Sequence, residues 1–263
     1  MKSTSEAAGF DLAMNMARQS LYRFAALSLV DPRAGSWEQL TGLRDDPLLP
    51  EAAALIRNLP QAQPAELGMG ECPIEMLDPR LVLDSLPDSE HALNTQFETT
   101  FGLLVSSPCP PYETEYIDSK FTFQRSNSLA DISGFYQAFG LTITDRHPER
   151  PDHVVLELEF MASLLQLERQ AANQDSVRRE EHQQVCRDAE TLFLKEHLAW
   201  WVPAFAKLLS HEGRGGFYEA VGAFLGALIP AERALLHVDI QSCPVSPSSL
   251  ERPEACEGCQ LAM

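Results

Sequence analysis

Apolar positions recur at helical spacing through most of the first half of the chain. Between Phe10 and Val30 they fall on one broad face, which predicts an amphipathic helix that ends at Asp31-Pro32. The same spacing predicts shorter helices over residues 37–43, 51–59 and 89–101. The stretch between Gln61 and Asp78 is rich in proline, glycine and glutamate and weakly periodic, so it is predicted to be a loop or a lid.

The second half of the chain has a stronger helical pattern. It predicts helices over residues 129–139, 175–197 and 216–228, with an aromatic turn at 198–209. Pro151 is expected to open a long central helix, because proline lacks only an N–H that the first helical turn leaves unpaired. β-branched residues nowhere alternate with polar ones. The pattern predicts an all-α protein: a single bundle-like helical domain over residues 1–238, then an irregular, flexible tail over residues 239–263.

Composition and charge narrow the classes of partner. The 263 residues include 20 Lys and Arg against 38 Asp and Glu, which gives a formal net charge of −18. A phosphate-rich surface would repel such a chain, which argues against nucleic acid and anionic membranes and favours a basic partner. The sequence has no stretch typical of a membrane span or an export signal, so the expected location is the cytoplasm.

Sequence motifs of catalysis are missing. The chain has no G-x-S-x-G elbow, no G-x-x-x-x-G-K-[ST] phosphate loop, no G-x-G-x-x-G and no E-x-x-H pair of a di-iron site. In the tail, Cys243, Cys256 and Cys259 form C-x12-C-x2-C, a spacing that suits zinc or an iron–sulfur cluster once a fourth ligand joins. Solvated thiols are the preferred interpretation. A metal- or cluster-binding accessory protein is the alternative function.

One constellation combines aromatic and acidic side chains on either side of the rigid Pro110-Pro111 pair. Two phenylalanines, four residues apart, point the same way from the helix before it, and two tyrosines beside carboxylates follow it. Its members are Phe97, Phe101, Tyr112, Glu113 and Tyr116. An aromatic floor with an acidic rim suits a groove for a basic, apolar peptide. The alternative is that the aromatic side chains belong to the core and the acids are solvated.

A second constellation, Pro151-Asp152-His153, stands at the expected start of the central helix. The neighbouring carboxylate and imidazole could form an acid–base pair, and a helical hydrolase built on Asp152 and His153 is the least favoured function. No nucleophile or metal motif accompanies them, however, and a structural role at the helix start explains the residues equally well.

Together these motifs resemble the TorD/DmsD/NarJ family of redox-enzyme maturation chaperones. The resemblance rests on Phe101-Gly102, Pro110-Pro111-Tyr112-Glu113-Thr114, Asp131…Gly134-Phe135-Tyr136 and Pro151-Asp152-His153 with Glu157 in the following helix, in this order within residues 10–235. Arg150 stands where the family commonly has glutamate. The resemblance implies that a partner peptide is bound by Phe97, Phe101, Tyr112, Glu113, Tyr116, Asp131, Phe135, Tyr136, Pro151, Asp152, His153 and Glu157.

The resemblance also implies an all-helical fold without catalysis of its own. Such a chaperone binds the twin-arginine leader or N-terminus of a molybdoenzyme catalytic subunit of the dimethyl sulfoxide reductase type. It assists insertion of the bis-molybdopterin guanine dinucleotide cofactor before export or assembly. No tightly bound cofactor is implied, only weak guanine nucleotide binding, and the choice between a monomer and a swapped dimer stays open.

Both constellations are expected to meet in the folded chain, with Tyr112 and His153 bordering one concave surface. If the carboxylate of Asp152 or Glu113 pairs with a leader arginine in a partly buried contact, reversing its charge costs on the order of 1–3 kcal/mol of binding. Changing Glu180 or Glu181, which are remote in sequence, is expected to cost little.

Overall fold

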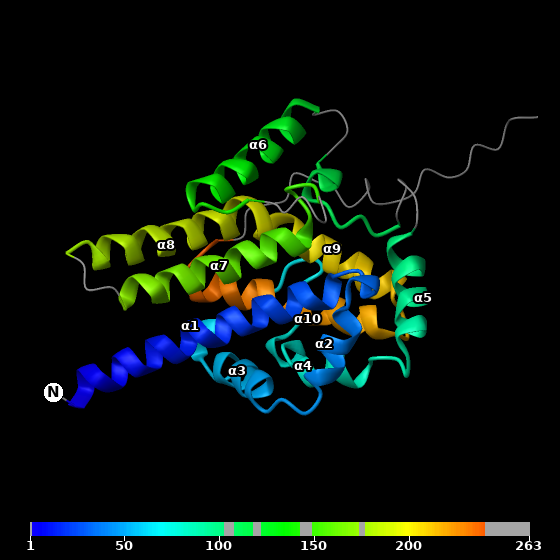
Figure 1. Cartoon of the computed structure of the whole chain (residues 1–263), viewed down its shortest axis with the longest axis horizontal. Helices are drawn as coiled ribbons and strands as arrows, with labels where there is room; N and C mark the ends of the chain where they lie inside the picture. The colour runs from blue at the N-terminus through cyan, green and yellow to red at the C-terminus, as the bar shows by residue number, and fades with distance from the viewer. Residues whose placement is uncertain (1, 103–107, 118–121, 143–148, 174–176, 240–263) are drawn as a thin grey trace, which may run out of the picture.

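Long helices form the body of the protein. The computed structural model describes residues 2–102, 108–117, 122–142, 149–173 and 177–239. In Figure 1, α1 (Lys2–Leu29), α7 (Val154–Ala172) and α8 (Arg179–Phe193) lie side by side with their axes roughly aligned. The α9 helix (Ala199–Glu212) packs against α10 (Phe217–Leu235), which also contacts α1. The described segments contain no β-strand, and the all-α prediction is confirmed.

The core lies among these helices. The α10 helix is buried almost all the way round, and large side chains from α7, α8, α9 and α10 fill the interior, including Phe160, Phe193, Trp201 and Phe224. α8 passes through a π-helical turn (Leu194–Leu198) directly into α9. The predicted aromatic turn at 198–209 is therefore wrong. Pro203 costs the helix about 3 kcal/mol, but burial of the flanking Trp201 and Phe205 contributes a comparable or larger amount.

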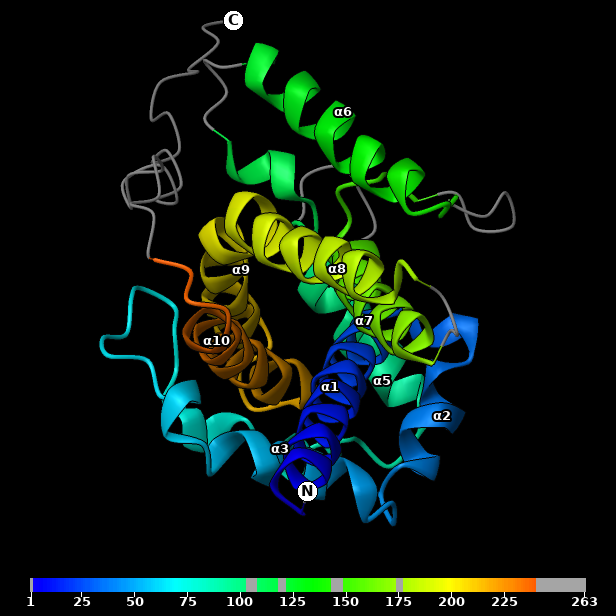
Figure 2. The ribbon, with the colours of Figure 1, turned by 90° about the vertical axis from the view of Figure 1, so that its left-hand side faces the viewer.

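Shorter helices cover the other faces of the body. They are α2 (Ser36–Gly42), α3 (Leu48–Arg57), α4 (Pro79–Asp84), α5 (Glu90–Phe101) and α6 (Thr122–Ala138). The side chain of Ser89 caps α5 by accepting from the N–H of Ala92, which satisfies one of the unpaired donors at the helix start. Figure 2, which views the molecule from one end, shows α6 on the outside of the molecule, above α8.

The irregular segment between Gln61 and Asp78 is fastened to α10. The Cys72 N–H donates to the carbonyl of Gly226 over 2.7 Å, and the ion pair between Glu71 and Arg233 has both side chains buried. Gly70 has φ +83°, and a Cβ there would clash with the carbonyl of Pro203. Of the two predicted states, the structure has a packed loop with 3-10 turns at Pro60–Ala62 and Ile74–Met76.

Several predicted helix boundaries need correction. The helix α6 begins at Thr122, before the predicted residue 129, and α10 continues through Pro230 to Leu235. The central helix α7 begins at Val154, because Asp152 and His153 pair with another segment. None of the described helices is long and apolar enough to cross a membrane. The expected tail lies outside the described residues apart from Asp239, so the domain boundary stays a prediction.

Candidate functional site

The two constellations meet at the start of α7. The Glu113 N–H donates to the carbonyl of Asp152, and the Val154 N–H donates to the carbonyl of Pro111, each over 2.9 Å. This antiparallel bridge holds a 3-10 turn (Glu113–Tyr116) against the first residues of α7. The rings of Tyr112 and His153 lie edge to face, 5.1 Å apart. The expectation that these distant segments meet is confirmed.

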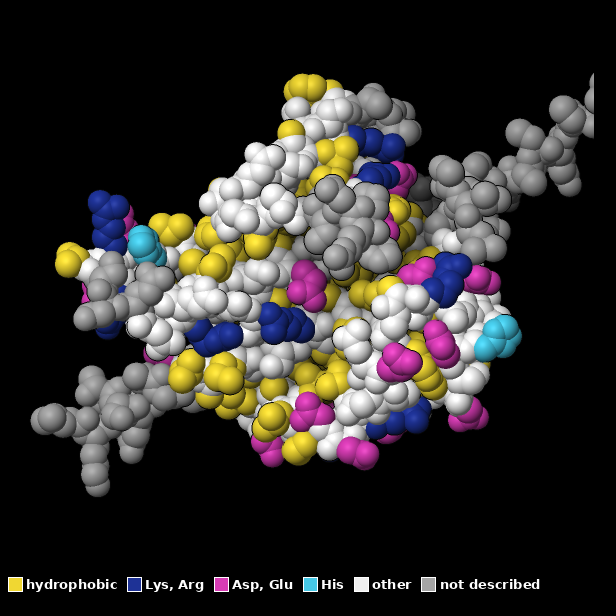
Figure 3. Space-filling view, viewed as in Figure 1, with side chains coloured by type: hydrophobic (Ala, Val, Ile, Leu, Met, Phe, Trp, Pro, Cys, Tyr) yellow, Lys and Arg dark blue, Asp and Glu magenta, His cyan; other side chains and the backbone are white. Residues whose placement is uncertain are grey.

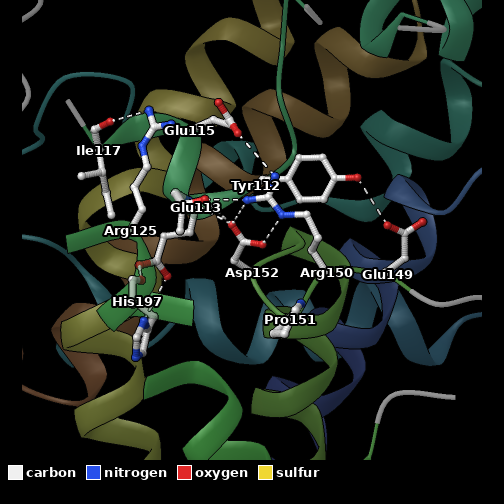
Figure 4. A network of polar contacts seen from close by, with 12 residues as sticks. Tyr112, Glu113, Glu115, Ile117, Arg125, Glu149, Arg150, Pro151, Asp152 and His197 are labelled. Atoms are coloured by element: carbon white, nitrogen blue, oxygen red, sulfur yellow. Dashed lines mark hydrogen bonds and ion pairs between the residues drawn. The ribbon is translucent and has the colours of Figure 1, made fainter. Parts of the chain in front are cut away.

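Asp152 is the anchor of this junction. Its carboxylate is 0% exposed and accepts from the backbone N–H of Thr114 (3.1 Å) and from the Thr114 hydroxyl (2.7 Å). Two nitrogens of the Arg150 guanidinium approach it as a fork, over 3.0 and 2.8 Å (Figure 4). Such a bidentate pair is among the stronger hydrogen-bonded ion pairs. The expectation that Asp152 meets a leader arginine needs correction, because Arg150 of the same chain already occupies this carboxylate.

Arg150 closes the junction toward the surface. Its guanidinium lies 4.4 Å from the centre of the Tyr112 ring, a cation–π distance, and 3.4 Å from the Glu115 carboxylate. The Tyr112 hydroxyl donates to Glu149 over 3.4 Å. With 43% of its side chain exposed, Arg150 links the buried Asp152 to the solvent-facing groups around it.

Glu113 forms a second anchor one step deeper. Its side chain is 2% exposed, accepts from the Ser128 hydroxyl of α6, and lies 3.0 Å from Nδ1 of His197. The other ring nitrogen of His197 is 3.3 Å from the carboxylate of Asp131, again on α6. Glu113 therefore holds α6 to the body and is not accessible to a partner, which corrects its predicted role in direct contact.

His197 and Trp201 are site residues that the motifs did not identify. Trp201 donates from its indole N–H to the Glu157 carboxyl over 3.1 Å. Burial, followed by the nearby Glu113 charge, raises the pKa of Glu157 well above its usual range. His197 lies in the π-helical turn and Trp201 in α9. A single polar group in an apolar helical stretch carries no recognisable sequence signal, so the motifs do not identify either residue.

His153 caps α7 and does not form an acid–base pair. Its Nδ1 accepts from the Val155 N–H over 3.2 Å, which requires an unprotonated nitrogen. Burial lowers the pKa of His153 to about 4, so the imidazole is neutral at physiological pH. The Asp152 carboxylate is bonded to Thr114 and Arg150 instead. Of the two hypotheses for this motif, the structure supports the helix-start role.

Comparison with known proteins places these residues in a family. Residues 73–207, just over half of the chain and all of the junction described above, match the family model described as nitrate reductase delta subunit. The chain belongs to this family. The predicted membership in the TorD/NarJ group of maturation chaperones is thereby confirmed.

Three relatives illustrate the similarity. The chain is 31% identical over 193 residues to the perchlorate reductase assembly chaperone of Dechloromonas aromatica, covering 72% of this chain and 76% of that protein. It is 37% identical over 112 residues (43% and 54%) to the selenate reductase assembly chaperone of Thauera selenatis. It is 27% identical over 143 residues (54% and 63%) to the chaperone TorD of Aliivibrio salmonicida. The matched part thus spans about half the length of the selenate reductase assembly chaperone, and the same share of a chlorate reductase assembly chaperone of Ideonella dechloratans.

These relatives are named as chaperones, which agrees with the prediction that the chain is not an enzyme. Within this member of the nitrate reductase delta subunit family, the aromatic residues of α6 hold that helix in place. Phe135 packs edge to face on Phe193 and His197, and the Tyr136 hydroxyl donates to the carbonyl of Pro151 over 2.9 Å.

The other predicted aromatic residues are core residues. Phe97 and Phe101 of α5 pack on Tyr218 of α10, with ring centres 6.1 and 5.2 Å apart. Tyr116 is buried against Trp201. The single aromatic floor predicted from the sequence is therefore wrong, and the alternative that these side chains belong to the core is correct.

An accessible rim nevertheless surrounds the buried anchors. Asp131 is 62% exposed, Glu115 and Glu149 also reach solvent, and Tyr112 is half-buried. Phe123 near the start of α6 is 75% exposed. This nitrate reductase delta subunit family member thus has acidic groups and an apolar side chain around the junction and α6.

The cysteine alternative stays a prediction. Cys243, Cys256 and Cys259 lie outside the described residues. In the described part of the chain, Cys72 and Cys186 are free thiols, and no group of three or more His, Cys, Asp or Glu side chains is arranged to hold a metal ion.

Proposed function

We propose that this chain is an assembly chaperone that binds the twin-arginine leader or N-terminal segment of a molybdoenzyme catalytic subunit in the cytoplasm. It holds the subunit until the bis-molybdopterin guanine dinucleotide cofactor is inserted, before export or assembly. The observation that carries the proposal is the family match, which spans the whole junction from Tyr112 to His197. The relatives' names as reductase assembly chaperones support a reductase client.

Charge and surface chemistry support the same proposal. The chain carries a net charge of −18, and its acidic rim is held in place by buried anchors. A leader with two arginines and an apolar segment needs carboxylates for the first and apolar surface for the second. The rim residues Glu115 and Asp131, with Tyr112 and Phe123, provide both kinds of contact.

Titration calorimetry with a synthetic peptide tests the site. The peptide carries two adjacent arginines followed by an apolar segment, and Asp131→Asn and Glu115→Gln are compared with the matched control Glu181→Gln on α8. Each rim variant should weaken binding about two- to fivefold, as expected for exposed ion pairs, while the control binds like the wild type. Equal losses in all three variants would mean that diffuse charge recognises the peptide.

Two further measurements complete the test. Raising the salt concentration should weaken binding without abolishing it, because salt screens exposed charges over about 8 Å but leaves apolar contacts. A tagged form of the full chain should co-purify with the catalytic subunit of a molybdoenzyme. If it co-purifies with no such subunit in cells that make one, the proposed function is wrong.

A further inference from the structure

A pair of arginines lies on the α1–α7 surface without carboxylate contacts. Arg23 of α1 and Arg169 of α7 make no ion pair within 4 Å among the described residues. Figure 3 shows basic side chains gathered over α1 and α7. This arrangement is unexpected in a chain where acidic residues outnumber basic ones by 38 to 20.

Neutral amides fix the two guanidinium groups in place. The Gln166 oxygen accepts from Arg23 (2.8 Å) and from the Gln19 amide (3.3 Å), while the Gln19 oxygen accepts from Arg169. Arg169 also donates to the oxygen of Asn15. A continuous chain of amide side chains therefore runs from one guanidinium to the other, which orients both groups without neutralising either.

Nearby carboxylates act on these arginines from a distance, Glu168 on Arg169 and Glu159 on Arg23, without forming an ion pair with either among the described residues. Glu168 is bound to Arg187 (2.6 Å) and to the Asn15 amide. Glu159 lies within electrostatic range of Arg23 but does not form an ion pair with it. Burial, followed by the charge of Arg23, lowers the pKa of Arg169, which is the effect expected of two cations held close together.

If these amide contacts served only to hold α1 to α7, they would not need the positive charges of two unpaired arginines. A glutamate in place of Gln166 would reach the same donors, Arg23 and the Gln19 amide, and would neutralise Arg23, which would hold the helices more firmly. Oriented, uncompensated guanidinium groups are instead what an oxyanion requires. A tetrahedral phosphate has oxygens on several sides, so it can accept from more than one guanidinium group.

We propose that Arg23 and Arg169, held by Gln19 and Gln166, form a binding site for a phosphate group. The ligand is inorganic phosphate or the phosphate end of a nucleotide. The site lies on the α1–α7 surface, and its existence does not depend on the proposed chaperone function.

Thermal unfolding of the full chain in phosphate tests the proposal. Inorganic phosphate and pyrophosphate at millimolar concentration should raise the melting temperature relative to sodium chloride of the same ionic strength. Gln166→Glu, an isosteric change, should stabilise the protein without ligand and lower its phosphate affinity at least about tenfold, because the Arg23 guanidinium would then have an internal carboxylate.

The control variants separate a defined site from general charge. Arg23→Gln should lose phosphate binding, whereas Arg33→Gln, which removes an exposed arginine paired with Asp31, should bind like the wild type. Among nucleotides, GDP should bind and guanosine should not if the phosphate is recognised. The proposal is overturned if wild type shows no effect of phosphate, if Gln166→Glu binds as wild type does, or if guanosine binds as well as GDP.

Discussion

Two buried charge clusters hold this protein together, and they differ in how they reach the surface. In the first, Arg18 of α1 forms a fork with Glu232 of α10 over 2.9 and 2.7 Å and pairs with Glu190 of α8 over 3.0 Å. The Tyr22 hydroxyl completes it by donating to Glu232. In the second, Arg150 forms the same kind of fork with Asp152, beside the Glu113–His197 pair.

The difference lies in the elements that supply the partners. The Arg18 cluster joins three long helices, and its charged side chains are almost inaccessible, so it acts as an internal tie. The Arg150 cluster joins a 3-10 turn, the start of α7 and α6, and it opens to solvent through Arg150 and Asp131. The same ion-pair chemistry therefore stabilises the fold in one place and supports an exposed rim in the other. Only the second lies wholly within the family match.

The largest effect is expected at the first cluster. Arg18→Met should lower the free energy of unfolding by about 3–5 kcal/mol, because it leaves two buried carboxylates without a cation. Urea denaturation measures the change, with the exposed Arg33→Met as control, expected within about 0.5 kcal/mol of wild type. If Arg18→Met is as stable as the control, the internal tie does not exist.

A pH-dependent effect is expected at the second cluster. The unfolded chain protonates His153 near pH 6.5 but the folded chain only near pH 4. Between these values the unfolded state binds more protons, so this contribution is complete above pH 6.5 and is lost as the pH falls, by about 2 kcal/mol at about pH 5. His153→Asn keeps a capping oxygen but has no titrating group there. Between pH 7 and pH 5 its free energy of unfolding should therefore fall by about 2 kcal/mol less than that of the wild type.

The other titrating groups are the same in the wild type and in His153→Asn. Burial raises the pKa of Glu190 to about 7, so its contribution is complete below its ordinary pKa and is lost as the pH rises through 7, opposite to that of His153. The difference between wild type and His153→Asn cancels this term. Urea denaturation gives the free energy of unfolding of both proteins at pH 7 and pH 5. If it falls by the same amount in both, His153 does not cause the acid sensitivity.

The sequence predicted local structure and the meeting of two motifs well. Helical periodicity identified most helices, because the apolar spacing of an amphipathic helix can be recognised within one local stretch of sequence. Short polar and aromatic motifs, separated by ordinary amphipathic helix, predicted that Tyr112 and His153 meet across a gap in sequence. Burial was predicted less well: Phe97 and Phe101 face α10, and the carboxylates of Glu113 and Asp152 face inward, because the partners that cover them come from elsewhere in the chain.

Long-range charge pairs were not predictable from local patterns. Arg18 and Glu232 stand at opposite ends of the chain, and nothing near either residue signals the other. His197 is a single polar residue in an apolar stretch, and its role depends on Glu113, 84 residues away. The start of α7 was misplaced for the same reason. Pro151 and Asp152 suit a first helical turn, but their pairing with residues 111–114 holds them outside it.

The smallest effect on stability is expected at exposed apolar side chains, which can affect peptide binding at the rim without affecting the core. Phe123 lies on α6, the helix held by the second cluster, and Leu12 lies on α1, the helix that carries Arg18; both have large exposed surfaces. Phe123→Ser and Leu12→Ser should each unfold within about 0.5 kcal/mol of wild type, because neither opens a cavity. Only Phe123→Ser should weaken binding of the arginine-containing leader peptide, on the order of fivefold, if the apolar segment of the peptide covers that ring. Calorimetry of both variants against one peptide decides the matter, since equal losses would place the apolar contact outside the rim and leave the two regions alike in function.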